Sequence, residues 1–68
     1  MTPALRLRVR RLELGMTYTS LAEESGVNVG HLHSLEHGNA PMDGLRWRTL
    51  VSLAKALKMK PAKLMAEE

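Results

Sequence analysis

Histidine is the residue type in this 68-residue chain that most readily does chemistry, and its three copies lie close together. His33 and His37 are four residues apart, a spacing at which two imidazoles on one helix can hold a metal ion. His31 falls on another side of such a helix, and no carboxylate or further histidine completes a ligand set on that face. We therefore expect no metal site and no cofactor. Two interpretations of the imidazoles stay open: plain exposure to solvent, or, for His31 and His33 more than for His37, hydrogen bonds to an anionic partner that strengthen when the ring is protonated.

The sequence also shows no arrangement of residues that is typical of a catalytic site. Cysteine is absent, which removes thiolate nucleophiles, disulfides and thiolate metal ligands. No nucleophile with a base beside it and no pair of carboxylates is assembled along the chain. A chain this short buries only about 60% of the surface that its unfolded form exposes, which leaves little room for a catalytic cleft. We predict that the protein is not an enzyme.

The charge balance indicates an anionic partner. Ten Lys and Arg side chains against seven Asp and Glu give a net charge of +3, which favours nucleic acid as the partner. Hydrophobic residues make up 44% and charged residues 25%, as in a folded globule rather than a disordered tail. No run of about 18 apolar residues exists and residues 1–12 are rich in Arg, so we expect neither a membrane-spanning helix nor a secretory signal.

Glycine and proline divide the chain into segments of helix length. Phe is absent, so Leu, Val, Ala and Met must fill the core, and this composition favours helices over a sheet. We predict five helices, over residues 3–14, 17–25, 28–38, 43–57 and 61–65. The expected N-caps of the first four are Thr2, Thr17, Asn28 and Asp43, and Gly26 is expected to end the second helix in the left-handed conformation.

The turn between the second and third helices carries the most information. Only Gly26, Val27 and Asn28 separate them, and so short a turn joins two helices at a steep angle, as in a helix-turn-helix. The stretch GMTYTSLAEESGVNVGHLHSLEHG resembles the phage repressor and Cro type of helix-turn-helix. The positions that match the family pattern are Gly15, Thr17, Leu21, Ala22, Gly26, Val27, Leu32, Leu35, Glu36 and Gly38. With LRVRRLELG upstream and TLVSLAKALKMKPAKL downstream, the resemblance covers about nine-tenths of the chain.

This resemblance implies an all-α, compact five-helix domain spanning residues 1–68 as a single unit. It implies a sequence-specific transcription regulator, a repressor of prokaryotic or phage origin working in the cytoplasm, that binds double-stranded operator DNA as a homodimer. The third helix would lie in the major groove and read bases through Val29, Gly30, His33 and Ser34. DNA phosphates would be held by Arg8, Thr17, Tyr18, Thr19, Asn28, His31 and Asn39.

Three departures from the family pattern bear on how sharply the protein discriminates between DNA sequences, and weak base reading together with extra apolar surface favours a second hypothesis. Tyr18 stands where the family usually has Gln, and the loop 41–49 is about four residues longer than usual. The third helix presents no Arg, Gln or Lys, the side chains on which base reading usually depends. The alternative is a protein-binding module on the same scaffold, such as an antitoxin or an anti-activator, with little or no specific DNA binding.

Arg11 lies on the apolar face of the first helix, with Leu7 and Leu14 at helical spacing. A cation in such a stripe needs a partner, because burying an unpaired charge is expensive. The resemblance supplies one, since the family pairs this Arg with the Glu that ends the third helix. We therefore expect Arg11 and Glu36 to form a structural ion pair.

A second apolar stripe, formed by Leu5, Val9, Leu12 and Met16, lies roughly opposite the first. Two segments can cover it: the fifth helix with Leu64 and Met65, or the long loop with Leu45 and Trp47. In one interpretation both close over the stripe and tuck their side chains into the monomer. In the other, Trp47 and Leu45 stay accessible and form the contact between the two copies of a dimer.

Overall fold

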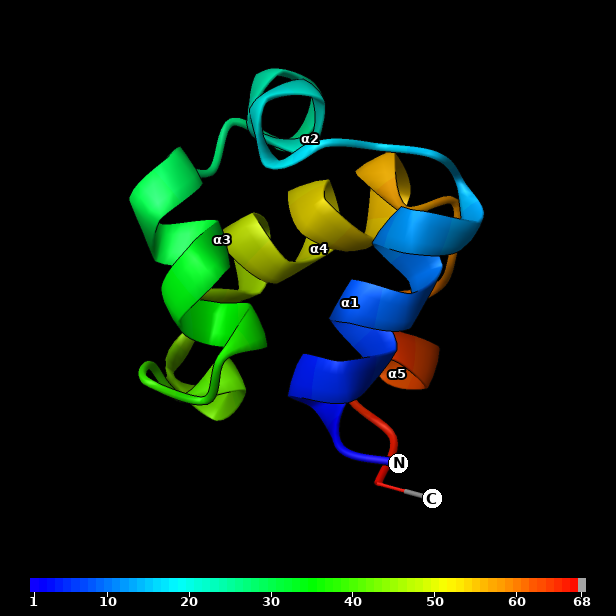
Figure 1. The fold of residues 1–68 in the computed structure, drawn as a ribbon. Helices are drawn as coiled ribbons and strands as arrows, with labels where there is room; N and C mark the ends of the chain where they lie inside the picture. The colour runs from blue at the N-terminus through cyan, green and yellow to red at the C-terminus, as the bar shows by residue number, and fades with distance from the viewer. Residues whose placement is uncertain (68) are drawn as a thin grey trace.

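The computed structural model describes residues 1–67, along which five α-helices and one short 3-10 helix follow one another (Figure 1). In chain order these are α1 (Pro3–Glu13), α2 (Tyr18–Ser25), α3 (Val29–Glu36), η1 (Met42–Gly44), α4 (Trp47–Ala56) and α5 (Pro61–Leu64). The described residues contain no strand, so the predicted all-α class with five helices is confirmed. Within this range no helix is long and apolar enough to cross a membrane.

The first three helices begin where local capping predicts. The Thr2 hydroxyl accepts from the Leu5 N–H at 3.2 Å, and the Asn28 side-chain oxygen accepts from the Gly30 N–H at 2.8 Å. Thr17 and Ser20 form a capping box, in which each side chain accepts from the other residue's backbone N–H. Gly26 ends α2 with a φ of 76°, in the left-handed region that favours glycine. The three N-caps and the turn of the helix-turn-helix are thus confirmed.

The start of the fourth helix was predicted wrongly. Asp43 caps no helix but lies exposed in η1, and α4 begins four residues later with Arg46 at the N-cap position. Leu45 and Arg46 are both extended, because Leu45 packs partly buried against the core and this contact holds the chain out of a helix. The third helix also ends two residues early, at Glu36.

Leucine fills the core where the helices meet. Helix α4 packs against both α2 and α5, and α1 packs against α3 and α5 (Figure 1). Seven leucines are completely buried: Leu7, Leu21, Leu32, Leu35, Leu53, Leu57 and Leu64. Burying one such side chain contributes about 2 kcal/mol, so this cluster is the main source of stability. It also fixes the angle between α2 and α3, because Leu21, Leu32 and Leu35 belong to it.

The second apolar stripe of α1 stays largely uncovered. Leu5 is 46% exposed and Leu12 is 55% exposed, so the expectation that the fifth helix covers Leu12 is wrong. The reason is that Arg6 and Arg10 hold the end of the chain on another side of α1. Arg6 Nη2 donates to the Ala66 carbonyl at 3.2 Å, and Arg10 Nε donates to the Leu57 carbonyl at 2.9 Å. Each bond satisfies a carbonyl that follows a helix and anchors that segment to α1.

Candidate nucleic-acid interface

A buried ion pair locks α3 to α1. Arg11 Nε donates to Glu36 Oε2 at 2.6 Å and Arg11 Nη2 donates to Glu36 Oε1 at 3.2 Å, while Arg11 Nη1 donates to the Met16 carbonyl at 2.8 Å. Both side chains are buried, and the hydrogen bond to Glu36 raises the pKa of Arg11 above its usual range. The expected structural pair Arg11–Glu36 is therefore formed, in the two-pronged geometry that makes such pairs strong.

Tyr18 completes this cluster. Its hydroxyl donates to Glu36 Oε1 at 3.0 Å, and the Arg11 guanidinium lies over its ring, 4.2 Å from the ring centre. Burial and the hydrogen bond to Glu36 raise the pKa of Tyr18 above 10.0, so its hydroxyl stays protonated as a donor. The Tyr18 side chain is thus committed to holding α2 against α1 and α3. The phosphate contact predicted for this residue is left to its backbone N–H in the first turn of α2.

Helix α3 turns one face away from the protein. Val29 is 41% exposed, Gly30 and His33 are exposed, and Ser34 is partly buried. Because these residues stand in two pairs four apart, they form one continuous surface, which we call the docking face. The structure thus brings together all four residues predicted to read bases. His31 is also exposed but lies at the flank of this face.

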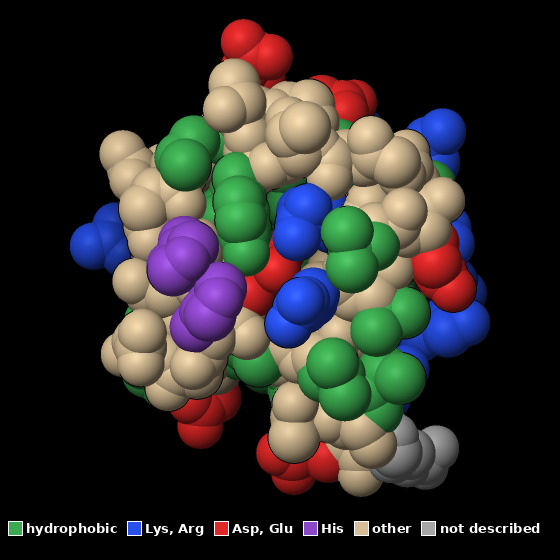
Figure 2. Space-filling model, viewed as in Figure 1, with side chains coloured by type: hydrophobic (Ala, Val, Ile, Leu, Met, Phe, Trp, Pro, Cys, Tyr) green, Lys and Arg blue, Asp and Glu red, His purple; other side chains and the backbone are tan. Residues whose placement is uncertain are grey.

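Aromatic rings continue from Tyr18 along α3. The His33 ring lies 5.5 Å from the Tyr18 ring and stacks on the His37 ring at 3.9 Å. The rings of the two histidines are nearly parallel, at 17°, and His37 Nδ1 lies 2.8 Å from the His33 carbonyl. Stacked rings do not converge on one point as a chelating pair does. Figure 2 shows imidazoles side by side on one surface, next to basic side chains and a recessed acidic one.

The residues predicted to hold phosphates differ in their exposure and in the hydrogen bonds they already make. Arg8 is exposed on α1, and Thr19 and Asn39 are exposed at the start of α2 and after α3. Thr17 uses its hydroxyl, and Asn28 its side-chain oxygen, to cap α2 and α3. The side-chain nitrogen of Asn28 is left for a phosphate. At the start of α2 both the hydroxyl and the backbone N–H of Thr17 are used in the capping box, so a phosphate there would be held by the N–H groups of Tyr18 and Thr19.

Sequence reasoning missed Arg46. This exposed side chain lines a hollow together with Asn28, His31 and Thr49, between the turn of the helix-turn-helix and the start of α4. None of the residues that line this hollow carries a carboxylate. The break at Gly44 could have indicated that Arg46 lies outside a helix. Because we expected Asp43 to start the fourth helix, Arg46 was placed inside it.

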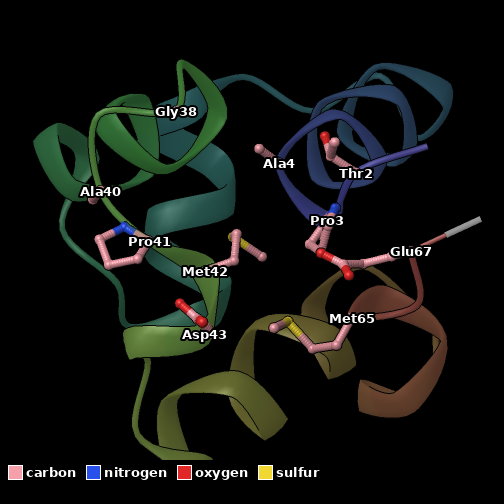
Figure 3. A pocket seen from close by; sticks show the side chains of 10 residues that line it. All are labelled: Thr2, Pro3, Ala4, Gly38, Ala40, Pro41, Met42, Asp43, Met65 and Glu67. Atoms are coloured by element: carbon pink, nitrogen blue, oxygen red, sulfur yellow. The ribbon is translucent and has the colours of Figure 1, made fainter.

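A different hollow separates the start of α1 from η1 and has the opposite character (Figure 3). Asp43 and Glu67 line it with mostly small or apolar side chains, and no Lys, Arg or His does. Two carboxylates without a cation repel phosphate groups. This side of the molecule is therefore poorly suited to bind nucleic acid.

Comparison with known proteins agrees with the fold. The P22 c2 repressor, solved in complex with a synthetic operator, superposes with a TM-score of 0.87 at 24% sequence identity, covering 100% of this chain and 98% of that one. The restriction-modification controller protein C.AhdI from Aeromonas hydrophila superposes with a TM-score of 0.81 at 27% identity, covering 93% of this chain and 91% of its own. No curated protein matches by sequence. The model of the Cro/C1-type helix-turn-helix DNA-binding domain matches residues 6–66, and the chain belongs to this family.

Proposed function

We propose that this protein is a sequence-specific transcription regulator, a repressor that binds operator DNA in the cytoplasm as a homodimer with α3 in the major groove. One observation carries the proposal: α2 and α3 are fixed to α1 by the Arg11–Glu36–Tyr18 cluster while the docking face stays uncovered. A rigid helix pair with a free outward face is what entry into a major groove requires. The operator-bound P22 c2 repressor supports DNA as the partner.

The docking face supplies short-range base contacts. Val29 packs on a thymine methyl group, His33 and Ser34 hydrogen-bond base edges, and Gly30 lets the backbone approach the groove floor. Backbone phosphates are held around this face by Arg8, Thr17, Tyr18, Thr19, Asn28, His31 and Asn39, to which we add Arg46. Arg46 belongs in this set because it stands beside Asn28 and His31 with no carboxylate to neutralise it.

The dimer contact is assigned to the start of α4. Trp47 is 69% exposed and Val51, four residues later on the same helix face, is 37% exposed. Large aromatic side chains that are exposed in a monomer commonly become the anchors of an interface. Leu45 is only partly exposed and packs against the core, so it adds less to this contact than Trp47 does. Two-fold symmetry then places the half-sites about 34 Å apart.

Selection of bound DNA from a random pool tests this function most directly. We expect enrichment of a two-fold symmetric sequence, and a mobility shift on random duplex DNA that weakens steeply between two salt concentrations. A pool that yields no common sequence, or a complex without salt dependence, would contradict the proposal.

The protein-binding module remains the second candidate, and a specific observation favours it. The exposed residues of α3 include no Arg, Gln or Lys, while Leu5 and Leu12 expose apolar surface on α1. In such a module the helix-turn-helix is only a scaffold. Absence of any shift on random duplex DNA at low salt would favour this candidate over the repressor.

A further inference from the structure

A third hollow lies on the opposite flank of α1 from the Arg11–Glu36 pair, between α1 and the segment that joins α4 to α5. It encloses about 490 Å³. Five of the ten Lys and Arg side chains of the chain line it: Arg6, Arg10, Lys58, Lys60 and Lys63. Among residues 1–67, Glu13 alone contributes a carboxylate to its lining. We call this site the basic hollow. Nothing in the proposed DNA complex uses it.

The cations of the basic hollow divide into two groups. Arg6 and Arg10 are structural, because their guanidinium groups donate to the carbonyls of Ala66 and Leu57 and so hold the walls together. Arg10 Nη1 also lies 3.5 Å from Glu13 Oε1, which commits the single carboxylate to an arginine. The three lysines are exposed, and within residues 1–67 no carboxylate lies at ion-pair distance from them. Their charges are available to a ligand.

Lys58 adds an independent observation. Its φ is 55°, and it is the one residue other than glycine with a positive φ among those that the structure describes. At its other left-handed positions the chain uses Gly15, Gly26 and Gly38, with φ of 67°, 76° and 73°. A lysine in this region is strained, whereas glycine adopts it freely. An unfavourable residue held at a turn that lines a charged hollow suggests that its side chain is needed there.

Apolar surface adjoins these charges. Val9 lines the basic hollow, and one turn of α1 to either side brings the exposed side chains of Leu5 and Leu12. In Figure 2 apolar side chains run along the molecule next to basic ones at the right-hand edge of the view. A ligand for the whole surface must therefore present carboxylates on one side and apolar groups on the other.

We propose that the basic hollow and the Leu5–Val9–Leu12 stripe together bind an acidic amphipathic helix of another protein. Its apolar residues lie on the stripe and its carboxylates pair with Lys58, Lys60 and Lys63. A second copy of this chain fits poorly, because a two-fold contact would set these lysines against each other. Duplex DNA fits poorly as well, because it has no apolar face to cover Leu5 and Leu12. This inference goes beyond the proposed function and does not depend on it.

The probe is a fluorescein-labelled synthetic helix with leucines at helical spacing and glutamates flanking them, read by anisotropy. Its matched control carries glutamine in place of glutamate. We expect the full-length protein to bind the acidic peptide about tenfold more tightly than the neutral one. The double variant Lys60→Gln, Lys63→Gln should lose about tenfold in affinity for the acidic peptide, and Leu12→Ser a similar amount. Arg48→Gln, which removes an exposed cation outside the hollow, should change it less than about twofold.

Lys58→Gly separates binding from folding. Glycine relieves the left-handed turn, so Tm should rise by a few degrees. The same variant should lose affinity for the acidic peptide, a combination that a purely structural lysine cannot produce.

Four outcomes would overturn the inference. Equal binding of the acidic and neutral peptides would remove the role of charge, and an unaffected Leu12→Ser variant would remove that of the stripe. Equal losses in the lysine double variant and in Arg48→Gln would show general electrostatic attraction. In the fourth outcome the acidic peptide does not bind, and the lysine double variant loses either its affinity for random duplex DNA or its self-association. The basic hollow would then be a binding site for nucleic acid or for a second copy of the chain, respectively.

Discussion

Arg11 and Glu36 illustrate how a buried charge pair can serve geometry more than stability. Desolvating both groups costs free energy that their attraction only partly repays, so an apolar pair of similar size can stabilise as well. An apolar pair would make no directional hydrogen bonds and so would not fix the orientation of the helices. Arg11 bridges Glu36 and the Met16 carbonyl, and Glu36 accepts from Tyr18, so a single cluster fixes the relative positions of α1, α2 and α3.

We expect Glu36→Ala to lower the free energy of unfolding by about 3 kcal/mol or more, because it leaves Arg11 buried without its partner. The double change Arg11→Met, Glu36→Leu should cost less than Glu36→Ala alone. Tyr18→Phe serves as a graded control that removes one hydrogen bond and should cost about 1 kcal/mol. Urea melts measure all three. Small and equal effects in every variant would mean that the cluster contributes no coupling.

Base contacts and phosphate contacts should separate in DNA binding. Ser34→Ala should lower the ratio of specific to non-specific affinity by about 1 kcal/mol, the value of one base contact. Arg8→Ala should weaken both affinities about equally and flatten the slope of log affinity against log salt by about one unit. Arg48→Ala is the matched control, an exposed arginine on α4 that is not among the proposed phosphate contacts. If the salt slope of Arg8→Ala equalled that of Arg48→Ala, Arg8 would not contact a DNA phosphate.

At the scale of the elements, local chemistry determined what could be predicted. Thr2, Thr17 and Asn28 cap their helices through contacts within three residues, and such contacts can be read from sequence. The start of α4 could not be predicted from sequence, because the packing of Leu45 on the core outweighs the preference of Asp43 for capping a helix. The same holds for the site. The docking face follows from helical spacing, whereas Arg46 and the exposed Leu12 depend on how distant segments are anchored.

Two capping candidates with opposite outcomes test this argument. Asn28→Ala should destabilise the protein by about 1 kcal/mol, because the Gly30 and His31 N–H groups lose their acceptor. Asp43→Ala should change stability by less than about 0.5 kcal/mol, since Asp43 caps nothing. Thermal melts of both variants measured together give the comparison. A loss at Asp43 as large as that at Asn28 would show that Asp43 supports α4 after all.

At the scale of the whole molecule, three surfaces carry different chemistry. The proposed DNA-binding surface combines the polar side chains of the docking face with Arg8 and Arg46, which suits a groove lined by phosphates. The basic hollow joins lysines to an apolar stripe on another flank of α1. The start of α4 presents Trp47 and Val51. The three proposals thus assign DNA, a second copy and a further protein to different side chains, so removing one set should leave the direct contacts made by the other two in place.

Trp47 gives the sharpest test of the proposed dimer contact. If it anchors the dimer, Trp47→Ala should weaken dimerisation and cooperative operator binding while leaving the helical circular dichroism nearly unchanged, because the side chain is 69% exposed in the monomer. Trp47 is the only tryptophan, so its fluorescence reports on this site alone. Its emission should shift to the blue as protein concentration rises through the dissociation constant of the dimer, since the ring then leaves water.

Val51→Ala, on the same helix face, should weaken the dimer less, and Arg48→Ala should have little effect. A Trp47 spectrum independent of concentration, together with unchanged sedimentation of Trp47→Ala, would move the dimer contact to another surface.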